Sequence, residues 1–314
     1  MSTSDNSPHS PSSTFDSGTP SLTFSSTESS VSVSSAEPGP NFVFSALEYE
    51  SESKFLHFVI QELEIWHQKN LSSPEPGHTV YQFTHLPISL GELLFTEIDK
   101  RFRLRQTWNT NSRTLRVKMP GEGHDCVQRW LTKSCSRWVR SGLIDWNEYD
   151  NLDAGVGTDI KLPTSPFAKS CKQPDFFLRP KDDELLPTIA VEVGWSQSAP
   201  ALREDMELLL RGGGGAVDVV ILVNWKIRQQ GTVVAGTVEA WRLDQNGQPT
   251  MTQSEEIFPI PNPAQTQRLG VTRRELFESI LRPGRNPNEI LYFDIDLLRS
   301  EASYTFRLIN LSPA

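Results

Sequence analysis

The chain has 314 residues, 37% hydrophobic and 22% charged, which suits one large soluble domain or two small ones. No run approaches the roughly 18 apolar residues of a transmembrane helix, and the N-terminus lacks the basic and apolar regions of a secretory signal. Three cysteines without metal-ligand spacing fit reduced thiols, so we predict an intracellular protein, of cytoplasm or nucleus, with no membrane partner. Its oligomeric state is left open.

The charge is unevenly distributed along the chain. The net charge is −9, which by itself argues against a nucleic-acid partner. Residues 100–140, however, contain eleven Lys or Arg and only two acids, Glu122 and Asp125. An acidic chain with one basic segment can still attract phosphates locally.

Residues 1–40 have the composition of a disordered tail. They hold 15 Ser, 5 Thr and 5 Pro, with no Lys or Arg. Such a segment cannot bury enough apolar surface to offset its chain entropy. Its hydroxyls could be phosphorylated, or the tail could simply be solvated.

Residues 41–118 are predicted to form an accessory N-terminal subregion. Apolar residues over 53–68 recur at helical spacing, and 114–119 alternates like a strand. The segment 93–104 is ambiguous. We expect this subregion to pack on the core that follows.

Residues 119–245 are predicted to form that core, from alternating helices and strands. A helix over 123–142 closes at Gly142, and a second begins after Ser198 and stops at the glycine run 212–215. Because that run closes a helix instead of opening one after a strand, it is not a phosphate-binding loop. Strands are expected over 158–162, 175–178, 187–193, 217–225 and 233–243. This order predicts an α/β fold with a mixed central sheet flanked by helices, followed by a C-terminal accessory segment, 246–314, with a helix near 271–281.

Two carboxylates in this core stand out as a candidate metal site. Asp175 follows Pro174 at the mouth of one predicted strand, and Glu192 lies inside the next, between apolar neighbours. If these strands are adjacent, both side chains can converge on a hard cation such as Mg²⁺, with the Val193 carbonyl as a third ligand. In the alternative, Asp175 caps a turn and Glu192 faces solvent.

The ordered motifs resemble the PD-(D/E)xK (restriction endonuclease-like) superfamily, and in particular a group of uncharacterised fungal members. The matching residues are Met119-Pro120, His124-Asp125, Lys172-Gln-Pro174-Asp175, Glu192-Val193-Gly194 and Ser196-Gln-Ser198. The resemblance implies a restriction-endonuclease-like core in which Asp175 and Glu192 bind metal and an acid on the first helix, Asp125, assists. In the alternative, Asp125 simply pairs with Arg129 four residues on. It also implies a Lys two residues after the Glu, but this chain has Gly194 there.

Another lysine is therefore needed if the site is catalytic, because phosphodiester attack requires stabilisation of developing charge. Lys172, three residues before Asp175, is the preferred candidate over Lys226, although a surface role is an alternative. His124 beside Asp125 is interpreted as a helix-start residue with local hydrogen bonds, since no nucleophile motif accompanies it.

Arg129, Lys133 and Arg137, followed by Arg140, form a basic stripe on the helix predicted over 123–142. The stripe would either follow a DNA or RNA backbone or be a solvated face balanced by acids elsewhere. The leading hypothesis is a Mg²⁺-dependent, nuclease-like protein in which Asp175, Glu192 and Lys172 are catalytic. The alternative is a catalytically inactive binding or interaction module with the same fold.

Overall fold

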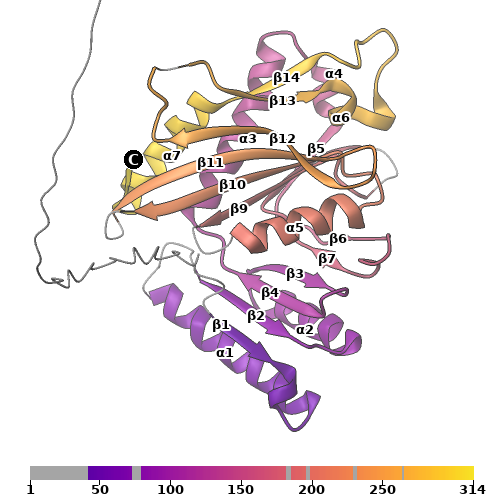
Figure 1. Ribbon diagram of the computed structural model, residues 1–314, viewed down its shortest axis with the longest axis vertical. Coiled ribbons are helices and arrows are strands. Elements are labelled where there is room, and N and C mark those ends of the chain that lie inside the picture. Colours follow the sequence, from indigo (N-terminus) through magenta and orange to yellow (C-terminus); the bar gives the residue numbers. More distant parts are fainter. Residues whose placement is uncertain (1–41, 73–78, 182–184, 196–198, 229–231, 264) are drawn as a thin grey trace, which may run out of the picture. The chain divides into compact units, whose positions relative to one another are not determined.

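The computed structural model describes residues 42–72, 79–181, 185–195, 199–228, 232–263 and 265–314 (Figure 1). All of them belong to one compact unit, Glu37–Ala314. The predicted tail at 1–40, the N-cap at Ser198 and the motif at 196–198 lie outside the described residues. No helix within the described ranges is long and apolar enough to cross a membrane.

The first sheet contains six strands, in the order β1-β2-β4-β3-β7-β6. β1 and β2 are parallel and the other neighbours are antiparallel. The strands are β1 (Phe42–Ser45), β2 (Val80–Thr84), β3 (Arg105–Asn109), β4 (Thr114–Lys118), β6 (Ile160–Lys161) and β7 (Cys171–Lys172). Helices α1 (Glu52–Ser72) and α2 (Ile88–Arg101) share a hydrophobic core with this sheet, and the short helix η1 (Ala46–Glu48) follows β1.

Alternation along β4 divides its side chains between two environments. Leu115 and Val117 are fully buried in the core formed with α1 and α2. Because side chains alternate along a strand, Arg116 and Lys118 lie on the opposite face. One face of the first sheet is thus apolar, and the other carries cations toward the candidate site.

The second sheet is larger and mixed. Its main path runs β12-β11-β10-β9-β8-β5, and β15 also pairs with β11. β9 and β10 are parallel, as are β11 and β15, whereas the remaining pairs are antiparallel. The strands are β5 (Leu152–Gly155), β8 (Phe176–Pro180), β9 (Ile189–Trp195), β10 (Val219–Arg228), β11 (Val233–Leu243), β12 (Pro249–Phe258) and β15 (Ser312–Pro313).

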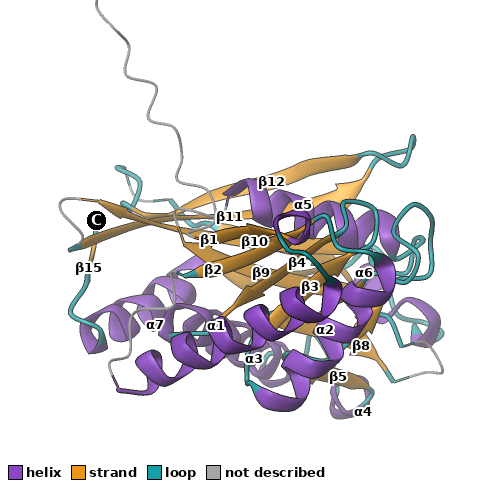
Figure 2. Ribbon diagram, turned by 90° about the horizontal axis from the view of Figure 1, so that it is seen from below, coloured by secondary structure: helices purple, strands orange, loops and turns teal. Residues whose placement is uncertain are grey.

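Helices cover both faces of this second sheet (Figure 2). Ile189, Val191 and Val193 of β9 enter a core shared with α3 (Glu122–Arg140) and α7 (Ile295–Leu308), while Ala190 enters a core shared with α5 (Ala199–Gly212). The same alternation places Glu192 on the α5 side. A two-stranded sheet of β13 (Arg268–Thr272) and β14 (Ile290–Asp294), the helices α4 (Trp146–Asp150) and α6 (Arg273–Phe277) and the short helix η3 (Glu278–Ile280) complete the described elements.

An α/β architecture with a mixed sheet is therefore confirmed. The helix over 123–142 is also confirmed: it ends with Gly142 at a φ of 74°, and Leu143 N–H donates to the Trp138 carbonyl, as in a Schellman motif. The helix near 271–281 is only α6 followed by η3. In the ambiguous segment 93–104, residues 93–101 belong to α2 and the last three follow it. The cysteines are free and buried.

One carboxyl at the start of β10 makes folding stability depend on pH. Burial, followed by repulsion from Glu275 and Glu278, raises the pKa of Asp218 to about 7 from 3.8, against the attraction of Arg242. When folding raises the pKa of a carboxyl, its contribution to the free energy of unfolding is fully present below the pKa of the unfolded state. That contribution is lost as the pH rises through the pKa of the folded state. Asp218→Asn should therefore be more stable than the wild type at about pH 8, by roughly 1–2 kcal/mol, because the group is partly exposed.

Urea unfolding at a series of pH values measures this difference. The stability gap between Asp218→Asn and the wild type should close as pH falls toward about 4. Asp244→Asn is a suitable control, because backbone hydrogen bonds lower the pKa of that exposed carboxylate, so the substitution should not stabilise. A difference in stability between Asp218→Asn and the wild type that does not change with pH would contradict this prediction.

Candidate functional site

The two carboxylates singled out in the sequence meet where β8 and β9 pair. Asp175 immediately precedes β8, and Phe176 is paired antiparallel with Val191 of β9. Asp175 Oδ2 accepts a hydrogen bond from the Val193 backbone N–H at 2.7 Å. Asp175 and Glu192 are almost fully buried, with exposed fractions of 1% and 0%. The predicted convergence of these two residues is present, and the solvent-facing alternative for Glu192 does not hold.

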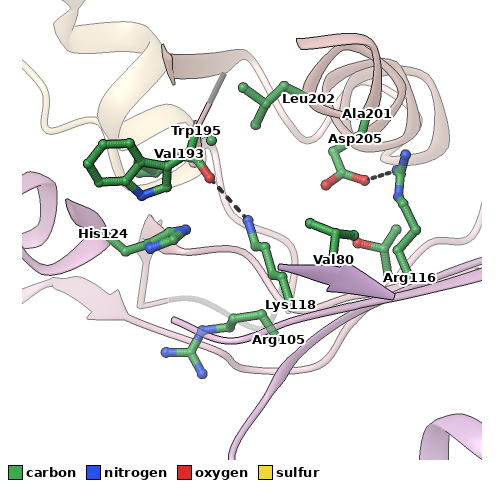
Figure 3. Close-up of a pocket in the computed structure, with 12 residues that line it drawn as sticks. Val80, Arg105, Arg116, Lys118, His124, Val193, Trp195, Ala201, Leu202 and Asp205 are labelled. Carbon is green, nitrogen blue, oxygen red and sulfur yellow. Dashed lines mark hydrogen bonds and ion pairs between the residues drawn. The ribbon is translucent and has the colours of Figure 1, made fainter. Parts of the chain in front are cut away.

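A lysine that the sequence analysis did not single out connects the carboxylates. Lys118, the last residue of β4, places its Nζ 2.7 Å from Asp175 Oδ2 and 3.2 Å from Glu192 Oε2. It also donates to the Val193 carbonyl oxygen at 3.3 Å (Figure 3). The ammonium thus contacts all three groups that the sequence suggested as metal ligands. The available signal was the alternation of 114–119, which puts Arg116 and Lys118 together on one face.

Lys172, the predicted cation, is also part of the cluster but lies deeper. It is fully buried, and its Nζ lies 2.9 Å from Glu192 Oε2 and 3.1 Å from Asp205 Oδ2. Asp205, on α5, also forms an ion pair with Arg116 of β4. Arg116 in turn contacts Glu204 at 2.6 Å. Lys172 therefore holds Glu192 and α5 together from inside, whereas Lys118 is 17% exposed and can reach a ligand.

Burial and mutual attraction set the protonation of this cluster. Burial acts to raise the pKa of Asp175, but Lys118, His124 and Lys172 outweigh it and hold the pKa well below the usual range. Burial acts to lower the pKa of Lys118, but Asp175 and Glu192 raise it above the ordinary lysine value. Asp175 is therefore ionised and Lys118 charged at neutral pH. Burial raises the pKa of Glu192 to about 7, although Lys172 and Lys118 oppose that rise.

The unpartnered oxygens provide a test of whether a divalent ion fits. Asp175 Oδ1 and Glu192 Oε1 are buried, and neither has a hydrogen-bond partner in the described part of the chain. Buried acceptors without partners are costly, and a bound cation would satisfy both. No group of three or more His, Cys, Asp or Glu among the described residues could hold a metal. Mg²⁺ commonly takes one or two carboxylates and leaves other positions to water and phosphate, so a donor set of two carboxylates and a carbonyl would suit that ion chemically.

A small cavity adjoins this cluster. It has a volume of about 40 Å³ and is lined by Lys118, His124, Gly194 and Arg105, among others (Figure 3). Gly194, where the resemblance led us to expect a lysine, lines the same cavity as Lys118. Asp125, the suggested helix acid, has no ion pair with Arg129 or any other residue that the structure describes. His124 has the predicted local bond, with its Nδ1 accepting from Gly121 N–H at 3.2 Å.

The basic stripe of α3 lies against α7. Arg129 and Lys133 both pair with Glu301, and Arg137 lies 3.5 Å from Asp294. These pairs offset part of the positive charge of the stripe. A role of Arg129, Lys133 and Arg137 in nucleic-acid binding stays a prediction.

No protein-family model matches this chain, and no curated protein matches it. The functional interpretation therefore rests on the geometry of the cluster around Asp175, Glu192 and Lys118.

Proposed function

We propose that the chain is a Mg²⁺-dependent, nuclease-like protein of the PD-(D/E)xK type that acts on nucleic-acid phosphodiesters. The observation that carries this proposal is the convergence of Asp175, Glu192 and Lys118, with one oxygen of each carboxylate left without a partner. The order α3, β5, β8, β9, α5 and β10 supports a restriction-endonuclease-like core. The elements α4, β6 and β7 lie between them, and β6, which corresponds to the core strand predicted over 158–162, belongs instead to the first sheet. The two unpartnered carboxylate oxygens support a cation seat at this place, and Lys118 would supply the neighbouring amine.

The residues would divide the chemistry among themselves. Asp175, Glu192 and the Val193 carbonyl would hold the ion, which supplies charge neutralisation and an activated water when bound. Lys118 would stabilise the charge that develops on the attacked phosphate, in place of the lysine absent at Gly194. Lys172 keeps Glu192 in place, since it contacts both Glu192 and Asp205 from a fully buried position.

Cleavage assays on single- and double-stranded DNA and on RNA test the proposal. Wild-type protein should cleave at least one of them with Mg²⁺ or Mn²⁺, and EDTA should abolish cleavage. Asp175→Asn and Glu192→Gln keep the shape but remove a charged ligand, so each should lower the rate by about a hundredfold or more. Glu204→Gln is the matched control, because that carboxylate is 59% exposed and, among the residues that the structure describes, pairs with Arg116 alone. Activity retained in both Asp175→Asn and Glu192→Gln would refute the assignment.

A second candidate function is a catalytically inactive module of the same fold. It is favoured by the balance of charge in the cluster, where Lys118, Lys172 and Arg116 face Asp175, Glu192 and Asp205. In that case the Lys118 ammonium permanently takes the place of a metal ion. The two candidates differ in a measurable way, because only the first requires binding of Mg²⁺ or Mn²⁺.

A further inference from the structure

Arg105 is an unusual cation in the cavity beside the carboxylates. It is the first residue of β3 and is half-buried. Its buried Nε has no hydrogen-bond partner, and the guanidinium forms no ion pair with any residue in the described ranges. By contrast, Arg116 and Lys118, which line the same cavity, are each paired with carboxylates. A guanidinium offers five N–H donors, so Arg105 is equipped to bind an anion.

The backbone holds this guanidinium next to the candidate metal site. A Cβ on Gly157 would come within 2.4 Å of Arg105 Nη1, so the guanidinium lies directly against that glycine. Gly157 N–H donates to the Pro174 carbonyl at 3.0 Å, and Pro174 precedes Asp175. The contact with Gly157 therefore fixes the arginine close to the carboxylate that would bind metal.

His124 supplies a second donor to the cavity. Its Nδ1 accepts from Gly121 N–H, which assigns the ring proton to Nε2. Burial lowers the pKa of His124, with Lys118 adding to that effect against Asp175, so the ring is neutral at pH 7. Among the described residues, none accepts a hydrogen bond from Nε2. A neutral N–H and an unpaired guanidinium thus line one cavity (Figure 3).

We propose that Arg105 and His124 form a phosphate-binding subsite that holds a backbone phosphate of the substrate beside Asp175 and Glu192. This inference rests on the proposed function. The cavity of about 40 Å³ has room for roughly three water molecules, which suits a small tetrahedral oxyanion. The subsite therefore recognises the phosphate and not the sequence of the nucleic acid, as backbone contacts generally do. Arginine suits this role because its planar fork matches phosphate oxygens.

Calorimetric titration with inorganic phosphate, in EDTA, tests the subsite independently of catalysis. The wild type should bind phosphate, and Arg105→Gln should weaken binding by at least about tenfold. Arg105→Lys keeps the charge but loses the fork, so its affinity should lie between these two. Arg103→Gln is the matched control, because Arg103 lies two residues earlier and is exposed. Melting temperatures of all variants establish that they are folded.

The outcomes separate this inference from the proposed function. Asp175→Asn should lose cleavage but still bind phosphate in EDTA. Phosphate should also displace a short fluorescent oligonucleotide from the wild type, which connects the subsite with a nucleic-acid backbone. The proposed phosphate subsite is refuted if the wild type does not bind phosphate, or if Arg103→Gln weakens phosphate binding as much as Arg105→Gln. Either result counts against the subsite even if the protein cleaves nucleic acid. If no cleavage is found but phosphate binding depends on Arg105, only the proposed catalytic function fails.

Discussion

Replacing Lys118 with methionine is expected to have opposite effects on metal binding and on catalysis. Cleavage should fall by about two to three orders of magnitude, because the variant loses the cation that stabilises the attacked phosphate. Affinity for Mn²⁺ should rise by at least about tenfold. The reason is that the amine contacts Asp175 Oδ2, Glu192 Oε2 and the Val193 carbonyl, so its removal frees three oxygen ligands. It also removes a positive charge a few ångströms from the ion in a site of low dielectric constant.

Stability supplies an independent measurement of the same substitution. In EDTA, Lys118→Met should unfold more easily, by about 3–5 kcal/mol, because buried carboxylates lose a partner. Mn²⁺ should restore much of this loss, since a ligand that binds only the folded state stabilises it. Thermal melts with and without Mn²⁺ would therefore show a larger metal-induced shift in the variant than in the wild type.

Lys100→Met is the control for Lys118→Met, because Lys100 is an exposed lysine of α2, 63% accessible, that pairs with Glu97. It should leave metal affinity and cleavage unchanged. If Lys118→Met leaves Mn²⁺ affinity unchanged, then the ammonium does not compete for the metal ligands. If the wild type does not cleave but the variant binds Mn²⁺ tightly, the inactive-module candidate is favoured.

The sequence was sufficient to locate Asp175, Glu192 and one of their cations, Lys172, but not Lys118. Alternation along 187–193 is enough to place Glu192 on the face opposite Ile189 and Val191, because strand periodicity is a local property. The bonds from Lys118 to Asp175 and Glu192 span 57 and 74 residues, and local patterns do not determine which strand faces which at that separation. Asp205 did leave a signal, since it is three residues after Leu202 on the buried face of α5.

Two elements of the C-terminal region, β12 and α7, were not predicted, and for β12 the physical reason is different. β12 is an edge strand, and only its last two residues, Ile257 and Phe258, are buried, so it has no apolar alternation to detect. α7 was not predicted either, and with it the acidic partner Glu301 of the basic stripe on α3 was missed. Whether the basic stripe on α3 is free or neutralised depends on acidic partners, such as Glu301, that lie far from it in the sequence.

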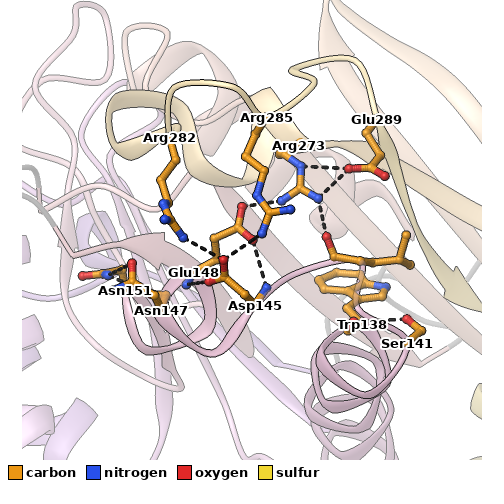
Figure 4. Close-up of polar contacts among 11 residues, drawn as sticks. Trp138, Ser141, Asp145, Asn147, Glu148, Asn151, Arg273, Arg282, Arg285 and Glu289 are labelled. Atoms are coloured by element: carbon orange, nitrogen blue, oxygen red, sulfur yellow. Dashed lines mark hydrogen bonds and ion pairs between the residues drawn. The ribbon is translucent and has the colours of Figure 1, made fainter.

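The largest effect on stability alone is expected at Arg273, the first residue of α6. This arginine is fully buried, and it pairs with Glu148 of α4 and with Glu289 (Figure 4). It also donates to the Leu143 carbonyl, just beyond the end of α3. Removal of one member of a buried ion pair leaves the others without compensation, which costs about 3–5 kcal/mol. Arg273→Met should therefore lower the free energy of unfolding by that amount.

Neighbouring arginines provide the matched comparison. Arg282 pairs with Asp145 at 2.7 Å, but the two side chains are 48% and 44% exposed, so Arg282→Met should cost less than about 1 kcal/mol. Arg273→Lys should be intermediate, because a lysine keeps the charge but cannot reach Glu148, Glu289 and the Leu143 carbonyl with one planar fork. In Arg273→Met, Glu148 still pairs with Arg285 at 2.6 Å, and this remaining ion pair limits the loss of unfolding free energy. Urea denaturation measures all three variants, and equal losses for Arg273→Met and Arg282→Met would show that burial does not strengthen this contact network.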